Sequence, residues 1–361
     1  MNWLEILSLI FALLCLGIQL LLIFFWLTNA KSYYKDQEPQ ISILIAARNE
    51  EGNIQKCLDS VLAIDYPNDK IEILVGNDFS EDNTLAIANK IAAGDNRVKV
   101  IDIKEKKTGN ALGKANVLAQ LAKQAKGEIF FITDADIEVP KTWVKSMLRA
   151  CDEGVAIVTG ITTIKDALFQ QTEWLYALGM IKVVTDLGLP VTAMGNNMLV
   201  TRKAYEAVGG YELVPFSVTE DLELCKQVRF KGFKARNLIE PDLLSITPPT
   251  KKFKTLIQQR QRWTKGALQL PIQVVIILIL MSLYLPALVI LALSFPWLAL
   301  AIFISKSTAQ TIFISLIRKR LNMSLKIIQT FIFDFYSFLI STITTIYLVL
   351  PIKIDWKGRK Y

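Results

Sequence analysis

The sequence predicts an α/β domain with a mostly parallel central sheet, flanked by transmembrane helices. Between residues 41 and 136, apolar strand-like runs alternate with amphipathic helical patterns, an alternation typical of right-handed crossovers between parallel strands. Long apolar blocks lie near both ends of the 361-residue chain, and 52% of its residues are hydrophobic. That share is high for a soluble enzyme, so we expect part of the chain to lie in lipid.

The first apolar block runs from Trp3 to Leu27. With a helical rise of about 1.5 Å per residue, it can cross a hydrocarbon core of about 30 Å. A cleaved signal peptide is the alternative, but no basic segment precedes the block, and the FFWL sequence at its end is a poor cleavage site. Residues 1–30 are therefore predicted to form an uncleaved transmembrane anchor.

Residues 36–265 form a central water-soluble segment, and about 230 residues is a typical size for a single domain. Lys31 and Lys35 precede this segment, whereas Glu5 is the only charged side chain in residues 1–5. By the positive-inside rule, the central domain is expected on the cytoplasmic side of the inner membrane.

Four strands are predicted in order along this domain. ISILIAARNEE (41–51) and IEILVGNDFSEDNT (71–84) each combine an apolar strand with a polar loop and the start of a helix. VKVIDI (98–103) is the third strand, ALGKANVLAQLAKQA (111–125) is a helix, and EIFFITDAD (128–136) is the fourth strand. Ligands of such sheets bind beyond the carboxyl ends of the strands.

Polar side chains follow three of these strands, in Arg48-Asn49-Glu50, Asn77-Asp78 and Asp134-Ala135-Asp136. Because the carboxyl ends of parallel strands meet at one edge, we expect the three loops to converge. The two carboxylates of the last loop can hold Mg²⁺ or Mn²⁺ against phosphate oxygens. The alternative is an acidic pair that caps a following helix.

Two other segments resemble a phosphate-binding P-loop and a calcium-binding loop, but each lacks residues that such a site needs. GNALGKA (109–115) has three residues between its glycines instead of the four of a P-loop, and it ends in alanine instead of Ser or Thr. DADIEV (134–139) lacks the glycine of a calcium loop at its sixth position.

Three further segments follow in the domain. MGNNMLVTRKAYEAVGGY (194–211) predicts a turn, a strand and a helix, and VTEDLELCKQVRFKGF (218–233) places Glu220 and Asp221 at the start of an amphipathic helix. Acids there can simply complement the helix dipole. QQRQRWTKG (258–266) directly precedes a membrane block, and its alternative is a basic helix lying on the bilayer.

The C-terminal region, residues 266–361, contains two apolar blocks. The block from Ala267 to Ser305 is long enough for a helical hairpin, and the block from Ile327 to Leu350 for one span. One crossing by the N-terminal anchor, two by the hairpin and one by the last block would put the basic C-terminal tail on the outer side of the membrane. Either the last segment is re-entrant or interfacial, or the charge rule fails here.

Composition excludes several classes of function. The chain has no histidine, which removes Ser-His-Asp and Cys-His catalysis, and its four cysteines contain no CxxC pair for zinc. The net charge of +8 lies largely at membrane flanks, so anionic lipid headgroups are favoured over nucleic acid as partners. A transporter would need more ionisable groups in its membrane blocks than Lys306 and Asp334.

The ordered set of motifs, flanked by membrane segments, resembles the membrane-bound glycosyltransferases of family 2, which include cellulose, chitin and hyaluronan synthases and ceramide-glucosyltransferase-like enzymes. The resemblance covers about residues 40–266 and implies a GT-A nucleotide-sugar-binding fold. Its motifs are NE at 49–50, Asn77-Asp78 with Ser80, TDAD at 133–136, TED at 219–221 and QRQRW at 259–263.

The resemblance also implies roles for single residues. Asp221 would be the catalytic base, and Asp136 would bind Mg²⁺ or Mn²⁺ directly, while Asp134 would face the ribose or the metal. The remaining set would bind the nucleotide (Arg48, Glu50, Asp78), the donor diphosphate (Lys114), and the diphosphate or the acceptor (Glu220, Gln259, Arg262, Trp263). One position departs from the family, because Asn77 stands where an aspartate is usual.

We therefore expect an inverting, metal-dependent transfer of a sugar from a nucleotide sugar, with UDP favoured, to a membrane-associated lipid or lipid-linked glycan. Processive polysaccharide synthesis is the alternative, although processive relatives tend to carry more transmembrane helices. A non-enzymatic alternative is a degenerate transferase that serves as a membrane scaffold or translocation partner. The tail WKGRKY (356–361) resembles tails of lipid-glycosylating members, and a solvated basic tail is the other interpretation.

Overall fold

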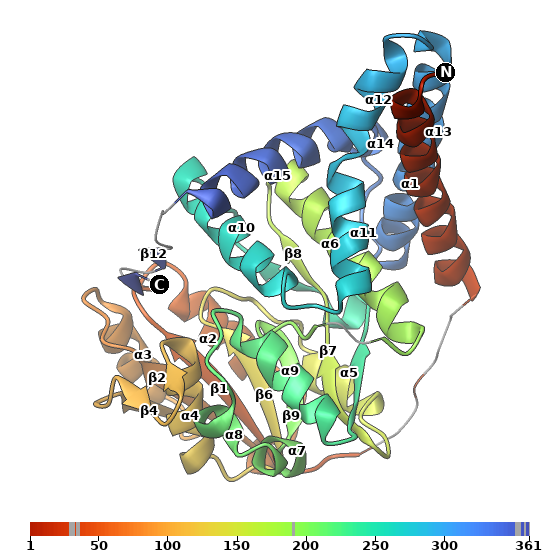
Figure 1. The fold of residues 1–361 in the computed structure, drawn as a ribbon. Helices are drawn as coiled ribbons and strands as arrows, with labels where there is room; N and C mark the ends of the chain where they lie inside the picture. The colour runs from red at the N-terminus through yellow and green to blue at the C-terminus, as the bar shows by residue number, and fades with distance from the viewer. Residues whose placement is uncertain (29–32, 34–36, 190–191, 351–354, 357–358, 361) are drawn as a thin grey trace. The chain divides into compact units, whose positions relative to one another are not determined.

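The computed structural model describes residues 1–28, 33, 37–189, 192–350, 355–356 and 359–360 (Figure 1). Lys31 and Lys35, which predict the membrane orientation, lie outside these residues, as does much of the C-terminal tail. The chain divides into two compact units. We call them the sheet unit (Ser32–Lys165 and Val184–Pro248) and the helical unit (Met1–Lys31, Asp166–Val183 and Pro249–Tyr361).

The sheet unit is built on a seven-stranded sheet in its described part, with the strand order β10-β7-β9-β6-β1-β2-β3. Strand β9 runs antiparallel to both of its neighbours, and the other pairs are parallel. This confirms the predicted mostly parallel sheet. The strands are β1 (Ile41–Ala47), β2 (Ile71–Asn77), β3 (Val98–Asp102), β6 (Ile129–Asp134), β7 (Val155–Thr159), β9 (Asn197–Thr201) and β10 (Lys234–Asn237).

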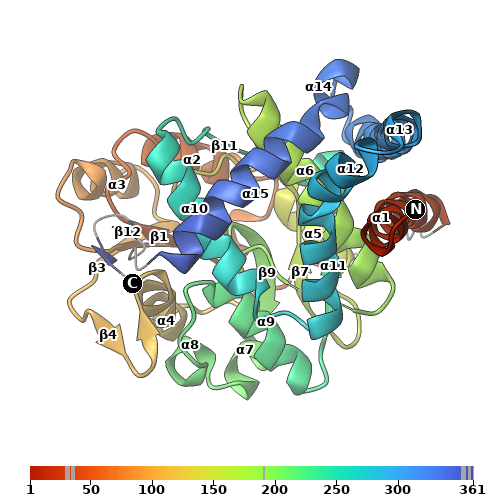
Figure 2. The same cartoon turned by 45° about the horizontal axis from the view of Figure 1, so that its top comes forward.

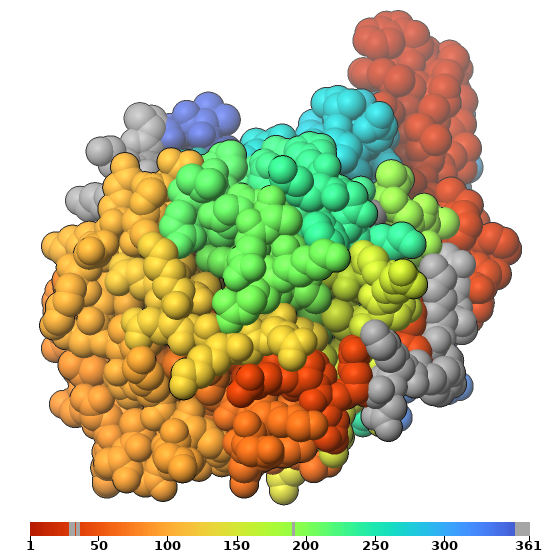
Figure 3. All heavy atoms as spheres, turned by 90° about the horizontal axis from the view of Figure 1, so that it is seen from below, coloured from red at the N-terminus to blue at the C-terminus, as the bar shows by residue number. Residues whose placement is uncertain are grey.

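Helices cover both faces of this sheet. They are α2 (Ile54–Leu62), α3 (Thr84–Ala92), α4 (Lys114–Gln124), α5 (Trp143–Arg149), α7 (Arg202–Ala207), α8 (Gly210–Leu213) and α9 (Glu220–Phe230). Residues of α2, α3 and α5 pack in one hydrophobic core, and residues of α4, α7 and α9 pack in the other. On the surface in Figure 3, the green segment of α7 to α9 lies beside the orange-yellow segment of α4, and α8 contacts α4.

The central strand β6 explains why its acidic end is well fixed. Phe131 lies in the core on one face and packs edge-on against Trp143, while Phe130 lies in the core on the other face and packs against Tyr205. Alternate side chains of a strand point to opposite faces, so a strand buried on both faces reads as a continuous apolar run. Asp134 is the first residue of β6 that is not fully buried.

Short elements complete the sheet unit. The predicted helix at 111–125 starts at Lys114 because Gly113 adopts a positive φ of 59° between it and a short strand. These elements are the hairpin of β4 (Lys107–Thr108) and β5 (Ala111–Leu112), the parallel pair of β8 (Thr162–Ile164) and β11 (Ser245–Thr247), and the 3-10 turns η1 (Asn68–Lys70) and η2 (Pro241–Leu243).

The helical unit contains α1 (Trp3–Thr28), α6 (Leu168–Asp186), α10 (Phe253–Ala267), α11 (Ile272–Ser282), α12 (Tyr284–Ala292), α13 (Pro296–Arg320), α14 (Ile327–Phe331) and α15 (Phe333–Val349). The small antiparallel pair β12 (Asp355–Trp356) and β13 (Arg359–Lys360) follows. Helix α1 packs along α12 and α13 (Figure 2). The last residues of α6 belong to the sheet unit.

Among the described residues, two helices are long and apolar enough to cross a membrane, α1 and α13. Helices α11 and α12 form a third candidate if the pair, bent by 42°, counts as one span. The final apolar block breaks into α14 and α15, and α15 has 17 residues, which is the lower end of the range of about 17–25 for a span. Helix α15 packs along α10 (Figure 2).

Candidate functional site

The carboxyl ends of β1, β2 and β6 meet at one edge of the sheet. Ala47 is in register with Asn77, and Ala46 is in register with Asp134. The three polar loops therefore start side by side, as expected from the strand pattern. Arg48 joins two of them, because its Nη1 donates a hydrogen bond to the carbonyl oxygen of Asp78 at 2.8 Å.

The first two loops form a largely buried polar region. Glu50 and Asp78 are both buried, and the Asn53 amide donates to Glu50 Oε2 at 2.8 Å. Asn77 donates from Nδ2 to Asp102 Oδ1 at 2.9 Å. This bond gives a physical reason for the departure at position 77, because an aspartate there would set a second carboxylate against that of Asp102.

Lys114 links three segments that are far apart in the sequence. Its Nζ lies 2.5 Å from Asp134 Oδ1 and 3.1 Å from Glu220 Oε1, and it donates to the carbonyl oxygen of Gly195 at 3.2 Å. Burial alone would lower the pKa of Lys114, but Asp134, Glu220 and Asp221 together raise it above its ordinary value. Lys114 is therefore a cation surrounded by acidic groups.

Asp221 lies in the first turn of α9, and main-chain groups hold both of its oxygens. Oδ2 accepts from the Gly195 amide at 2.7 Å, and Oδ1 accepts from the Leu222 amide at 2.8 Å. Burial, followed by repulsion from Glu220, raises the pKa of Asp221 from 3.8 to about 6, although Lys114 and the two amides oppose the rise. A carboxylate with a pKa in this range can accept a proton near neutral pH.

The two D-x-D carboxylates, Asp134 and Asp136, can supply only part of the ligand set of a divalent metal. Asp134 and Asp136 are half-buried on either side of the buried Ala135. In the described part of the chain, no three Asp, Glu, Cys or His side chains cluster closely enough to form a metal site. An ion here would take its other ligands from phosphate oxygens and water, which is usual for Mg²⁺.

Sequence reasoning gave no role to Gly195 or Asn197. A Cβ atom on Gly195 would lie 2.8 Å from Cβ of Asp221, so this close approach needs glycine. Asn197 is fully buried; it accepts from Trp143 Nε1 at 2.8 Å and donates to the carbonyl oxygens of Ile161 and Leu243. The Gly-Asn-Asn sequence at 195–197 predicts a turn, but it does not predict these contacts, because their partners lie in distant segments of the chain.

Gln259, Arg262 and Trp263 lie on α10 of the helical unit. Gln259 Oε1 accepts from Arg260 Nη1 at 2.6 Å, and the Trp263 ring packs edge-on against Trp174 with centroids 4.9 Å apart. Their assignment to the diphosphate and acceptor stays a prediction, because they belong to a different unit from Asp134 and Asp221.

Comparisons with known proteins agree with the resemblance. Residues 42–209 match glycosyl transferase family 2, and residues 129–350 match glycosyl transferase family group 2. The chain is 28% identical over 249 residues to a beta-monoglucosyldiacylglycerol synthase of Synechocystis sp., covering 64% of this chain and 48% of that protein. It is 27% identical over 259 residues to a poly-beta-1,6-N-acetyl-D-glucosamine synthase of Staphylococcus aureus, covering 68% of this chain and 60% of the other.

The chain thus spans about half the length of the curated relatives it matches. A solved mannosyltransferase from Pyrobaculum calidifontis, in complex with GDP-Man and Mn²⁺, aligns with a TM-score of 0.64 at 19% identity. The alignment covers 93% of this chain and 99% of that one, and it confirms the GT-A fold. Because the second family match extends over more than half of the chain, the protein belongs to glycosyltransferase family 2.

Proposed function

We propose that the protein transfers a sugar from a UDP-linked nucleotide sugar to a lipid or lipid-linked glycan at the membrane, with inversion at the anomeric carbon. The observation that carries this proposal is the grouping of Asp221, Lys114 and Asp134, since it combines a base with a cation at the strand ends.

Asp221 is the proposed general base. The acceptor hydroxyl gives its proton to the carboxylate as the new bond to the anomeric carbon forms, and the electron pair of the breaking bond leaves with the nucleotide diphosphate. The two amide hydrogen bonds fix the carboxylate before the acceptor arrives, and orientation of this kind lowers the barrier.

Stabilisation of the leaving diphosphate is assigned to cations. Lys114 supplies one positive charge beside the D-x-D carboxylates, and Arg262 of α10 is proposed to supply another. A divalent ion held by Asp136 and Asp134 would neutralise charge on the phosphate oxygens. Arg48, Glu50 and Asp78 are proposed to hold the nucleoside at the neighbouring loops.

A membrane acceptor is supported by the two candidate spans α1 and α13. The number of candidates, at most three in the described residues, supports a lipid acceptor over a polymer that needs its own channel. Orientation toward the cytoplasm rests on Lys31 and Lys35, and Glu220, Gln259 and Trp263 are proposed to line the diphosphate and acceptor side.

The test uses the full chain in nanodiscs with membrane lipid extract as acceptor and Mn²⁺ or Mg²⁺. Radiolabelled UDP-sugars and GDP-sugars are compared as donors, and products are separated into lipid and polymer fractions. We expect label from a UDP-sugar in a single lipid product, which chelation of the metal abolishes.

Asp221→Asn is expected to remove transfer, and Asp242→Asn, an exposed aspartate of the same unit, is the matched control. Equal turnover in the wild type and Asp221→Asn would refute the assigned base. Label only in a polymer would refute the lipid acceptor, and absence of turnover with every donor would favour the scaffold alternative.

A further inference from the structure

Arg260 lies inside the QRQRW sequence, between two residues that the family resemblance assigns to substrate. Its side chain is 5% exposed within the helical unit. Nη1 donates to Gln259 Oε1 at 2.6 Å, and the guanidinium carbon lies 4.3 Å from the centre of the Trp263 ring. A single guanidinium group therefore contacts both Gln259 and Trp263.

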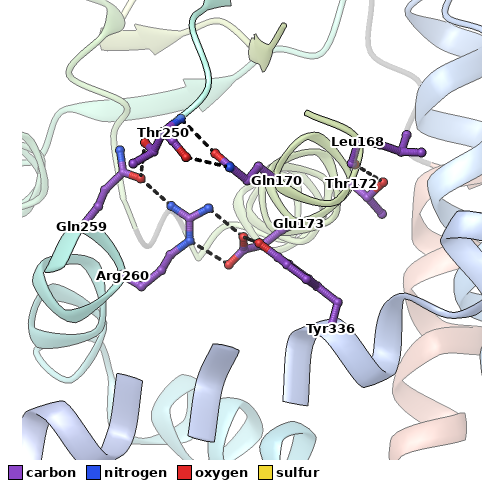
Figure 4. A network of polar contacts seen from close by, with 8 residues as sticks. All are labelled: Leu168, Gln170, Thr172, Glu173, Thr250, Gln259, Arg260 and Tyr336. Carbon is purple, nitrogen blue, oxygen red and sulfur yellow. Dashed lines mark hydrogen bonds and ion pairs between the residues drawn. The ribbon is translucent and has the colours of Figure 1, made fainter. Parts of the chain in front are cut away.

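Glu173 of α6 fixes the orientation of this guanidinium. Arg260 Nε donates to Glu173 Oε1 at 2.9 Å, and Nη2 donates to Oε2 at 2.7 Å, so the pair is bidentate (Figure 4). Such a fork sets the plane of the arginine as well as its position. Tyr336 of α15 donates to Glu173 Oε2 at 3.3 Å and holds the carboxylate from a third helix.

The neighbours of Glu173 on α6 support the same two residues. Gln170 exchanges two hydrogen bonds with the main chain of Thr250, whose hydroxyl donates to Gln259 Oε1 at 3.4 Å. Trp174 packs edge-on against Trp263. Three residues of helix α6 thus restrain Gln259 and Trp263, Trp174 directly and the other two through Thr250 and Arg260, all within the helical unit.

We propose that Glu173 and Arg260 are a positioning pair, which orients the Gln259 amide and the Trp263 ring toward the substrate. This inference rests on the proposed function. The Arg260 side chain is buried and that of Glu173 is 23% exposed. Stability alone does not account for the arrangement, because an ion pair removed from water is often no more stabilising than apolar residues of similar volume. Lysine could not replace Arg260, because it is a point charge without the planar fork needed for Glu173 and Gln259 together.

The test measures acceptor kinetics of the full chain in nanodiscs for Glu173→Gln, Arg260→Lys and Gln259→Ala. A misplacement of about 1 Å can cost about a hundredfold in rate, so we expect kcat to fall by about 10- to 100-fold in the first two variants. The KM for the donor should change less than about threefold, since the nucleoside is assigned to the other unit.

Two comparisons distinguish positioning from general stabilisation. The double variant Glu173→Gln/Gln259→Ala should lose less than the product of the two single losses, because part of the effect of Glu173 passes through Arg260 to Gln259. Tyr347→Phe is the matched control. Tyr347 lies on α15 and packs against α10, but it is not part of the network of polar contacts around Arg260 that Figure 4 draws. This variant should keep the wild-type kcat.

Multiplicative losses in the double variant, or an unchanged kcat in Glu173→Gln, would overturn the inference and leave the proposed function standing. If the wild type transfers no sugar, the proposed function fails and hydrogen exchange decides the inference. Faster exchange in Glu173→Gln confined to α10 would support positioning, while equal exchange in α10 of wild type and variant would overturn it.

Discussion

At the scale of single residues, two aspartates of the candidate site, Asp134 and Asp221, have different surroundings. Asp134 pairs directly with the Lys114 ammonium, whereas Asp221 accepts two main-chain hydrogen bonds and has a pKa of about 6. The second carboxylate can therefore take up a proton near neutral pH. Environment therefore assigns their roles.

This difference predicts the pH dependence of the reaction. Transfer needs Asp221 deprotonated, so kcat/KM of the wild type should be level above pH 7 and should fall about tenfold per pH unit below the pKa of Asp221. Asp221→Asn should lose at least about a hundredfold in kcat/KM at pH 7.5. A steady-state pH profile checks both, and an acid limb that is unchanged in the residual activity of Asp221→Asn would contradict the assignment.

The same pKa predicts a cost in stability. Because the folded-state pKa of Asp221 is raised above 3.8, the folded state binds the proton more tightly, and the free energy of unfolding falls as pH rises from about 4 to 6. Asp221→Asn removes this titration, so the free energy of unfolding of wild type relative to the variant should fall by about 1–3 kcal/mol between pH 4 and pH 7. Unfolding measurements of both proteins at several pH values check this, and a stability difference that stays constant from pH 4 to pH 7 would contradict the prediction.

At the scale of elements, loops that the sequence order separates are brought into contact. The residues before β9 lie against the start of α9, and Gly195 permits this approach. Gly195→Ala should displace Asp221 and lower kcat/KM by about a hundredfold, with the fold retained. Gly94→Ala is the control, since a Cβ there meets no atom closer than 3.4 Å. Equal activity in the two variants would show that the contact is dispensable.

The elements also show what the sequence could and could not predict. Strands β1 and β6 were predictable because they are buried on both faces and therefore read as unbroken apolar runs. Strands β7 and β10 were not predicted. Convergence of the strand ends followed from topology. The Arg260–Glu173 pair was not predictable, because its partners lie 87 residues apart and neither stands in a pattern that names the other. The break between α14 and α15 was also missed, since both halves are apolar.

At the scale of the whole molecule, stability draws on polar contacts in the helical unit as well as on the sheet core. Lys306 of α13 pairs with Asp334 of α15, and Gln310 and Ser307 provide further hydrogen bonds to them. Both charged side chains are buried, at 6% and 7% exposure. Such residues in apolar helices persist because each compensates the other.

Asp334→Leu should therefore destabilise the protein by about 3–5 kcal/mol, because it leaves the Lys306 charge uncompensated. Lys306→Met/Asp334→Leu should recover most of that loss. Unfolding in detergent, followed by circular dichroism, checks both variants. Additive losses in the double variant would contradict coupling between the two side chains.

The two main-chain hydrogen bonds to Asp221 have a consequence for how the sequence of the protein can diverge. Both amides that bind Asp221 belong to the main chain, at Gly195 and Leu222, so neither bond depends on the side chain at position 222. Side-chain substitutions around the site can therefore change which sugar or lipid is accepted while the orientation of the Asp221 carboxylate stays fixed by the backbone. Substrate preference and the orientation of the base are inherited through different parts of the sequence.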